Sequence, residues 1–367
     1  MQVPVTYLPR VWAGSQFVPG LLPKAIHPLS AHIKLTENCQ ARCVSCDYWK
    51  TRWKDEITTG RAVRLIDEIV DLGIGTLRLT GGEPLIRKDL FDVLERSRAR
   101  ELKQVVIQTN GLLLERFQEK INASPITHVN VSIDGMPETN DRIRGVDGYF
   151  DQAIRGIRAL EGKKVSFSVT LNGESAGELE RLAEVARELG AGLGYNILSR
   201  NLFFLANADL ATLWPKKQAA QQVAKFARET MQRPEFEVEY LRKYYGHEPL
   251  DEPACVLGYL QVFVLSNGDV LTGCYPLPPV GNIVETSLGE VLASEAYRRQ
   301  AEAMVRRECP GCTCGVESSL AMKHAFASGF YELSQLIGGG NKPRPSAPRA
   351  EQPQPMRPEI EQEPVAR

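Results

Sequence analysis

The sequence predicts an α/β fold built on a parallel sheet, followed by a small cysteine-rich domain. Two observations predict it. Over residues 31–196, short β-branched or apolar runs alternate with longer helical patterns, as in repeated βα units. The eight cysteines fall into one group near the start and one near the end of the chain. We therefore expect two folded units of different kinds.

Six runs in the first region have the length and composition of strands, and helix-length polar and apolar periodicity separates them. The alternation predicts that the strands run parallel, with the helices packed outside the sheet. The expected strands are Ala31–Thr36, Thr76–Thr80, Gln104–Thr109, His128–Ile133, Lys164–Thr170 and Gly192–Leu198.

The segments between the strands carry amphipathic helical patterns. Thr59–Leu72 and Asp89–Arg98 each place their apolar residues on one face and are expected to be outer-layer helices. A further helix, Ala211–Met231, leaves the barrel and ends before Pro234, because proline cannot continue a helix. We place the domain boundary there.

The second region contains a hairpin signal and then loses its apolar content. The turn Ser266-Asn267-Gly268-Asp269 separates the apolar runs Gln261–Leu265 and Val270–Thr272. A tail rich in Pro, Glu, Gln and Arg cannot bury enough apolar surface to fold. The expected divisions are an N-terminal segment 1–30, a core barrel 31–232, a cysteine-rich domain 233–318, a closing helix 319–337 and a disordered tail 338–367.

Composition restricts the function classes. The 367 residues are 43% hydrophobic and 24% charged with a net charge of −1, and no basic block stands out, which argues against nucleic-acid binding. No secretory leader and no apolar run of membrane-spanning length is visible. We expect a cytoplasmic protein with no membrane association and a small-molecule or peptide substrate.

The first cysteine group places Cys39, Cys43 and Cys46 within eight residues, directly after the first expected strand. Clustered cysteines in a large chain without a leader indicate metal thiolates rather than disulfides. Three protein ligands leave one metal coordination position open for a substrate. The alternative is a zinc knuckle, but zinc sites usually pair two C-x2-C units, and no nearby His or Cys completes one.

The C-x3-C-x2-C spacing resembles the signature of the radical S-adenosylmethionine (SAM) superfamily. The resemblance implies a partial (β/α)6 TIM-like barrel and a [4Fe–4S] cluster on Cys39, Cys43 and Cys46 that binds and reductively cleaves SAM. Relatives often carry an aromatic or large apolar residue before the third cysteine, where this chain has Ser45. Contact with the adenine is therefore assigned to Tyr48.

A second motif follows the second expected strand. Gly81-Gly82-Glu83-Pro84 resembles the GGE motif of the same superfamily, which implies binding of the methionyl amino group of SAM. Two glycines allow the backbone to approach a ligand closely, and Glu83 can accept hydrogen bonds from an ammonium group. By itself, the same sequence would be an ordinary turn into a helix.

Polar residues end the next three strands, where ligands bind in parallel βα folds. By resemblance, Ser132 and Asn172 contact the ribose or carboxylate of SAM, and Arg144 pairs with the carboxylate. The further candidates for SAM or the substrate pocket are Thr109, Asn110 and Asp134. The alternative is that these residues only form turns or are solvated side chains.

The second cysteine group consists of Cys255, Cys274 and the run Cys309-Pro-Gly-Cys312-Thr-Cys314, with the hairpin turn at Gly268 between the first two. This arrangement resembles the auxiliary-cluster extension called SPASM, or its shorter form called twitch. Five cysteines are enough for one auxiliary [4Fe–4S] cluster and leave one spare. A structural zinc ribbon is the alternative. Cys255 and Cys274 are the firmer ligands, joined by two of Cys309, Cys312 and Cys314.

The resemblance implies a radical SAM enzyme that makes a 5′-deoxyadenosyl radical and removes hydrogen from a peptide or small natural product. The net result would be oxidation, epimerisation or cross-linking. A flavodoxin- or ferredoxin-type donor would supply the electrons. The alternative from another class is a non-catalytic zinc-binding α/β scaffold. No residue is assigned to act on the substrate.

Overall fold

The computed structural model describes residues 4, 6–50, 55–198, 213–250 and 254–309. By its contacts the chain divides into Met1–His324 and Ala325–Arg367, and the described residues all belong to the first unit. The expected closing helix 319–337 and tail 338–367 lie outside the described residues, as do Cys312 and Cys314.

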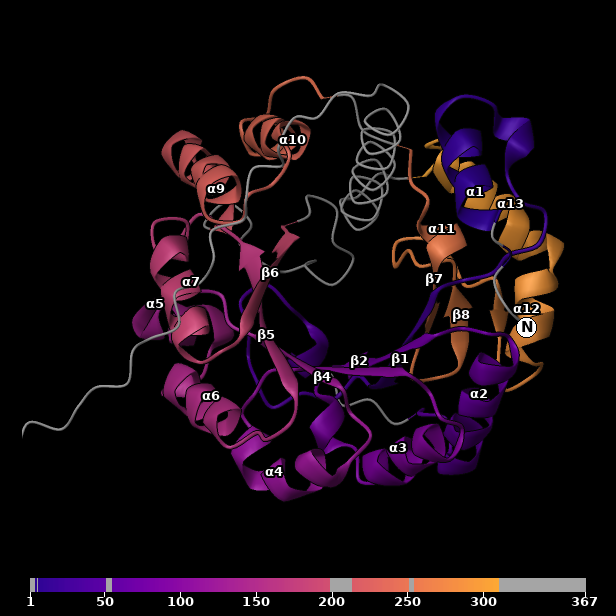
Figure 1. Ribbon diagram of the computed structural model, residues 1–367, viewed down its shortest axis with the longest axis horizontal. Coiled ribbons are helices and arrows are strands. Elements are labelled where there is room, and N and C mark those ends of the chain that lie inside the picture. Colours follow the sequence, from indigo (N-terminus) through magenta and orange to yellow (C-terminus); the bar gives the residue numbers. More distant parts are fainter. Residues whose placement is uncertain (1–3, 5, 51–54, 199–212, 251–253, 310–367) are drawn as a thin grey trace, which may run out of the picture. The chain divides into compact units, whose positions relative to one another are not determined.

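One nine-stranded sheet organises this unit, in the order β6-β5-β4-β3-β2-β1-β7-β8-β9 (Figure 1). The six strands expected in the first region are confirmed to within a residue at each end, and they pair in parallel throughout. Their bounds are β1 Ser30–Thr36, β2 Thr76–Gly81, β3 Gln104–Thr109, β4 His128–Ser132, β5 Lys164–Leu171 and β6 Gly192–Ile197.

Helices cover the outer side of these strands, as the alternation predicted (Figure 1). The first begins after Thr58, whose side chain accepts a hydrogen bond from the backbone N–H of Arg61 and so caps the helix. The outer helices are α2 Thr59–Asp71, α3 Leu90–Ala99, α4 Leu114–Ala123, α5 Pro137–Arg144, α6 Tyr149–Arg158 and α7 Leu179–Glu188.

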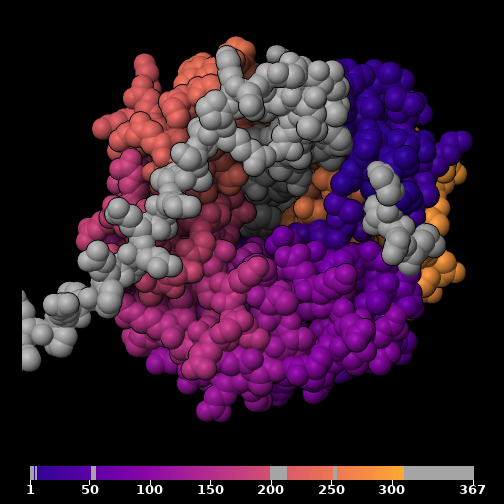
Figure 2. Space-filling view, viewed as in Figure 1, coloured from indigo at the N-terminus to yellow at the C-terminus, as the bar shows by residue number. Residues whose placement is uncertain are grey.

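The two faces of the parallel strands differ in polarity. In β2, Leu77 and Leu79 are fully buried under the helices, while Arg78 and Thr80 are only half-buried on the inner face. Side chains alternate between faces along a strand, so one face forms the apolar core. On the side of the molecule shown in Figure 2, the surface is hollowed between the magenta and the orange parts of the chain.

The hairpin predicted in the second region is confirmed, and it joins the same sheet. β7 (Gln261–Val264) pairs in parallel with β1, and β8 (Asp269–Leu271) pairs antiparallel with β7. β9 (Gly281–Asn282) completes the sheet beyond β8. The cysteine-rich region therefore extends the β1 edge of the sheet, which the sequence did not predict.

Two more helices, α12 (Leu288–Ala293) and α13 (Glu295–Val305), follow the hairpin. Ser287 and Glu290 form a reciprocal capping box at the start of α12. Arg61 on α2 donates to the carbonyl of Ile283 at 2.6 Å, and the backbone N–H of Leu288 donates to Glu68 at 2.7 Å. These bonds tie the hairpin region to the outer helices.

The helix expected over 211–231 was wrong as one continuous element. Residues 211 and 212 lie outside the described part, and Trp214–Lys216 is not helical. Pro215 explains the break, because proline has no N–H to donate and disfavours helical geometry at the preceding residue. Helix α9 is Lys217–Glu229, and it packs on α10, Glu235–Tyr245.

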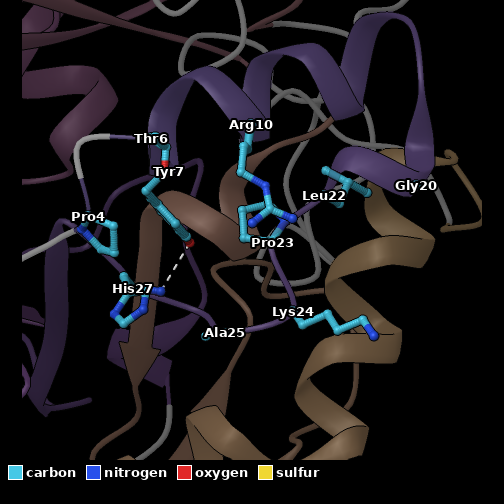
Figure 3. A pocket seen from close by; sticks show the side chains of 10 residues that line it. All are labelled: Pro4, Thr6, Tyr7, Arg10, Gly20, Leu22, Pro23, Lys24, Ala25 and His27. Carbon is cyan, nitrogen blue, oxygen red and sulfur yellow. Dashed lines mark hydrogen bonds between the residues drawn. The ribbon is translucent and has the colours of Figure 1, made fainter.

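An N-terminal helix that the sequence did not predict, α1 (Tyr7–Gln16), leads into the short turn η1 (Pro19–Leu21). The Tyr7 hydroxyl accepts from the backbone N–H of His27 at 3.0 Å (Figure 3) and donates to the carbonyl of Tyr259 at 2.8 Å. Tyr259 belongs to α11 (Leu257–Leu260), so Tyr7 fixes the N-terminal segment to the start of the hairpin region. No helix in the described part of the chain has the length and hydropathy needed to span a bilayer.

Candidate metal centre

The loop after β1 carries Cys39, Cys43 and Cys46, all half-buried. Its backbone is held by the end of α5: the N–H of Arg42 donates to the carbonyl of Arg144 at 3.0 Å, and the N–H of Val44 donates to that of Ile143 at 2.9 Å. A Cβ at Gly145 would lie 2.3 Å from the carbonyl oxygen of Arg42, so this close approach requires glycine there.

Two directed N–H donors reach the cysteine sulfurs. Asn110 Nδ2 lies 3.6 Å from Cys39 Sγ, and Arg144 Nη1 lies 3.9 Å from Cys43 Sγ. Burial raises the pKa of all three thiols, that of Cys39 to about 12, while Arg144 acts in the opposite direction on Cys43. Buried thiols of this kind ionise when a bound metal supplies positive charge, so the loop has the chemistry of a thiolate–iron site.

The sulfurs do not need to meet at one point. Among the described residues, no three His, Cys, Asp or Glu side chains converge on a single metal ion. In a four-iron cluster each thiolate binds a different iron, so the three-cysteine loop is compatible with such a cluster and with one iron left free of protein ligands.

Gly81 and Gly82 lie against the backbone of this loop. The N–H of Gly82 donates to the carbonyl of Thr36 at 2.7 Å, and that of Glu83 donates to the carbonyl of Asn38 at 2.8 Å. A Cβ on either glycine would lie 2.2 Å from one of these oxygens. The glycines therefore allow two protein segments to approach each other, a reason that differs from the ligand approach expected from the sequence.

Glu83 is fully buried and joins the ends of β2 and β3. Its carboxylate accepts from the Thr109 hydroxyl at 2.8 Å, the backbone N–H of Asn110 at 2.7 Å and that of Leu85 at 3.1 Å. Burial nevertheless raises the pKa of Glu83 to about 7. Through Asn110 this network continues to Cys39, and Pro84 begins the short turn η3 (Pro84–Ile86).

Asp134 and Arg144 form an ion pair with a 2.8 Å contact, and both side chains are largely buried. Asp134 also accepts from the backbone N–H of Thr170 at 2.7 Å. Burial alone lowers the pKa of the Arg144 guanidinium, but Asp134 outweighs it and the net shift is upward. Arg144 therefore stays charged beside Cys43, with its Nε atom buried and without a partner.

The remaining candidates, Asn172 and Ser132, contact backbone groups and side chains outside the three-cysteine loop. Asn172 is buried, donates to the carbonyl of Thr170 at 2.9 Å and accepts from the N–H groups of Glu174 and Ser175, which is a turn-forming pattern. Ser132 is half-buried on β4, and its carbonyl accepts from the Tyr149 hydroxyl at 3.1 Å.

In the second cysteine group, Cys255 and Cys274 are buried together with Leu257 and Met304. Cys309 is half-buried near the end of the described part. The structure therefore brings the two firmer candidates into one apolar cluster.

Two family profiles match the chain. The profile of the radical SAM superfamily matches residues 33–186, and that of the SPASM iron–sulfur cluster-binding domain matches residues 255–314. The first match includes the three-cysteine loop, and the second includes all five later cysteines. The chain belongs to the radical SAM superfamily.

Membership of the radical SAM superfamily implies a [4Fe–4S] cluster and SAM as cofactors, and the SPASM domain implies auxiliary iron–sulfur binding. The three-cysteine loop fits the first cluster by its thiol donors and by the buried guanidinium beside them. The family match also argues against the zinc scaffold considered above.

Curated relatives match over part of their length. An Fe-coproporphyrin III synthase of Methanosarcina barkeri is 33% identical over 160 residues, 42% of this chain and 40% of that protein. An AdoMet-dependent heme synthase of the same organism is 35% identical over 178 residues, 47% of this chain and 49% of that protein. The chain thus spans less than half the length of either.

Among solved structures, SuiB of Streptococcus suis bound to S-adenosylmethionine matches with a TM-score of 0.59 at 18% identity, covering 75% of this chain and 68% of SuiB. SuiB is also known bound to the precursor peptide SuiA. At this identity the similarity concerns the fold, and it confirms the partial barrel expected from the sequence.

One charged group of this radical SAM chain was missed by the sequence analysis. Lys34 on β1 is buried, pairs with Glu37 at 3.0 Å and also donates to the Tyr48 hydroxyl. Its ammonium lies 3.7 Å from the centroid of the Tyr48 ring and 4.8 Å from that of Tyr275, the neighbour of Cys274. Strand alternation, which places His32 and Lys34 on the inner face, was the available signal.

Proposed function

We propose that the chain is a radical SAM enzyme that cleaves SAM reductively and removes hydrogen from a peptide or small natural product. The observation that carries the proposal is the three-cysteine loop at the carboxyl ends of the parallel strands. There, Asn110 contacts Cys39 at 3.6 Å and the buried Arg144 contacts Cys43 at 3.9 Å. Ligands bind at this end of parallel βα folds.

In this proposal Cys39, Cys43 and Cys46 hold the [4Fe–4S] cluster. When bound, the cluster and SAM supply a 5′-deoxyadenosyl radical that abstracts a hydrogen atom, and this chemistry belongs to the cofactors. Asn110 and Arg144 contribute hydrogen bonds to the ligand sulfurs, which tune cluster potentials in iron–sulfur proteins.

The chain's other residues position SAM. The segment Gly81–Pro84 is proposed to bind the methionyl ammonium group of SAM. The Glu83 carboxylate accepts three hydrogen bonds from the protein, and its oxygens can accept a further one from the ammonium group. We propose Tyr48 for the adenine. Ser132, Asn172 and Arg144 are proposed for the ribose or carboxylate, and Thr109, Asn110 and Asp134 for support of this site.

For the second group, we propose one auxiliary [4Fe–4S] cluster held by Cys255, Cys274 and two of Cys309, Cys312 and Cys314. A cluster with four protein thiolates has no position for substrate, so electron transfer or structural support is its proposed role. The buried, apolar surroundings of Cys255 and Cys274 support a closed site of this kind.

The polar inner face of the sheet supports a polar substrate. Arg78, Asn130 and Ser168 are half-buried and share this face of the sheet. SuiB, similar at the level of fold, has been seen with a precursor peptide, and the curated relatives are named for small-molecule products. A flavodoxin- or ferredoxin-type donor is proposed as redox partner, and the cytoplasm as compartment, because free thiols stay reduced there.

The test uses full-length protein reconstituted anaerobically with iron and sulfide, then incubated with SAM and dithionite. We expect 5′-deoxyadenosine from the wild type and none from Cys43→Ala. Iron content separates this proposal from the zinc alternative, since a scaffold protein would hold zinc and make no 5′-deoxyadenosine. Undiminished turnover in Cys43→Ala would refute the site.

The substrate class is tested in the same system with deuterium-labelled peptides and small-molecule candidates. Deuterium that appears in 5′-deoxyadenosine identifies the substrate, because the hydrogen removed from its carbon ends in that product. The Cys43→Ala variant serves as the control for label arriving by other routes.

A further inference from the structure

A pocket of about 490 Å³ opens on the outer side of the sheet next to the three-cysteine loop. Its wall comes from η3, α3, α4 and the residue Gln40, and none of its ten lining residues is acidic. The radical-generating chemistry proposed above does not use it.

Three cations surround this pocket. Lys88, Arg116 and Lys120 are exposed, and none of them forms an ion pair with an acidic side chain in the described part of the chain. Arg87 also lines the pocket, but its charge is balanced by Asp89, with a 2.6 Å contact. The pocket rim therefore carries net positive charge with no internal compensation.

The floor of the pocket is apolar. The Phe91 and Phe117 rings lie 6.0 Å apart between centroids, and the apolar Leu85 also lines the pocket. Ile86 is 37% exposed at the edge. The Arg116 guanidinium lies 5.4 Å from the centroid of Phe117, and the Lys120 ammonium lies 5.4 Å from that of Phe91, so the cations border the aromatic floor.

Gln40 connects the pocket to the cluster loop. It follows Cys39 in the chain, and its side-chain Nε2 donates to Asn110 Oδ1 at 3.3 Å. Asn110 in turn contacts Cys39 Sγ at 3.6 Å. The other side-chain atom of Gln40, Oε1, is buried without a hydrogen-bond partner. A molecule bound in the pocket would therefore contact Gln40, the residue that follows the proposed cluster ligand Cys39 in the sequence.

We propose that this pocket is the docking site of an acidic flavodoxin that delivers the electron for SAM cleavage. The proposal rests on the function proposed above. Three cations without an acidic partner among the described residues complement an acidic protein surface. The neighbouring rings of Phe91 and Phe117 offer an apolar contact for the dimethylbenzene edge of a flavin. The transfer moves one electron from the donor's anionic flavin hydroquinone, which becomes the neutral semiquinone without losing a proton, to the proposed iron–sulfur cluster, which is reduced by one electron.

The experiment compares two electron sources in the same reconstituted protein. The triple variant Lys88→Glu, Arg116→Glu, Lys120→Glu is assayed with dithionite and with a flavodoxin reduced by NADPH and its reductase. We expect flavodoxin-driven 5′-deoxyadenosine formation to fall about 10-fold or more at low ionic strength, and dithionite-driven formation to change less than about 2-fold. Added salt should lower the wild-type rate when flavodoxin is the electron source and should not lower it when dithionite is.

The matched control reverses the charge of three exposed arginines on α6 and α7, in the triple variant Arg158→Glu, Arg181→Glu, Arg187→Glu. It changes the net charge by the same amount away from the pocket, so its flavodoxin-driven rate should stay within about 3-fold of wild type. An equal loss in both triple variants would overturn the docking site, since only net charge would then matter.

A second readout does not depend on turnover. Carbodiimide joins lysine amines to contacting carboxylates, and we expect the cross-linked peptides to contain Lys88 or Lys120. Cross-links confined to other lysines would overturn the proposal, as would a charge effect seen with ferredoxin and absent with flavodoxin. Failure of the wild type with dithionite would instead refute the proposed function.

Discussion

The two cysteine groups of this chain differ in what surrounds their sulfurs. In the first, Cys39 and Cys43 face the side-chain N–H donors of Asn110 and Arg144 and lie at the edge of a polar network. In the second, Cys255 and Cys274 are 5% and 4% exposed and pack against Leu257 and Met304.

The difference agrees with the two roles proposed for these cysteines. A half-buried loop with polar neighbours leaves room for an exchangeable ligand and stabilises charge. The buried, largely apolar neighbours of Cys255 and Cys274 suit the auxiliary site proposed above, in which protein thiolates would fill every position. On the assignment proposed above, the surroundings of the cysteines, as well as their spacing, distinguish the site that would bind SAM from the closed auxiliary site.

The largest expected effect is a difference in SAM cleavage between variants of the two cysteine groups. The double variant Cys255→Ala, Cys274→Ala should lose about one cluster's worth of iron while retaining part of its SAM cleavage, whereas Cys43→Ala should retain none. Iron quantitation and 5′-deoxyadenosine assays on the same samples measure this. Unchanged iron in the double variant would mean that the auxiliary ligands are misplaced.

A smaller effect concerns the polar wall of the first group. Arg144→Met leaves Asp134 buried without its cation, and we expect a loss of about 3–5 kcal/mol in the free energy of unfolding of the apoprotein. Adding Asp134→Asn should recover part of that loss, as measured by denaturant unfolding. An additive double variant would show that the ion pair does not couple the two residues.

The apolar wall of the second group should respond to truncation. Met304 is 1% exposed beside Cys255 and Cys274, so Met304→Ala leaves a cavity and should cost about 3 kcal/mol of stability. Met304→Leu, which nearly conserves volume, is the control and should cost less than about 1.5 kcal/mol. Equal denaturation midpoints for both variants would contradict the tight packing.

The smallest effect is a pH dependence in the first group. Burial raises the pKa of Glu83 to about 7, above its usual 4.5, so the folded protein holds this proton more tightly than the unfolded chain. The stabilisation is present below pH 4.5 and is lost as pH rises through 7, about 2 kcal/mol between pH 5 and 7. Glu83→Gln should flatten this part of the stability profile, and an unchanged slope would exclude Glu83 as its source.

Local patterns predicted much of this protein. The βα alternation located six strands to within a residue, and the turn at Asn267–Gly268 located the hairpin. Pro215 carried a signal against one long helix that was not used, and Lys34 stood at an inner-face position of a strand. Both were readable because periodicity and proline act over a few residues.

The sequence by itself determined the strands, the loop that carries Cys39, Cys43 and Cys46, and the family to which they point. Only the tertiary structure decided that β7 pairs with β1, that Gly82 faces the backbone of Asn38, and that Asp134 and Arg144 neutralise each other. These contacts join residues far apart in the chain. Which sheet edge stays free, and which charges become buried together, depends on how the whole unit packs.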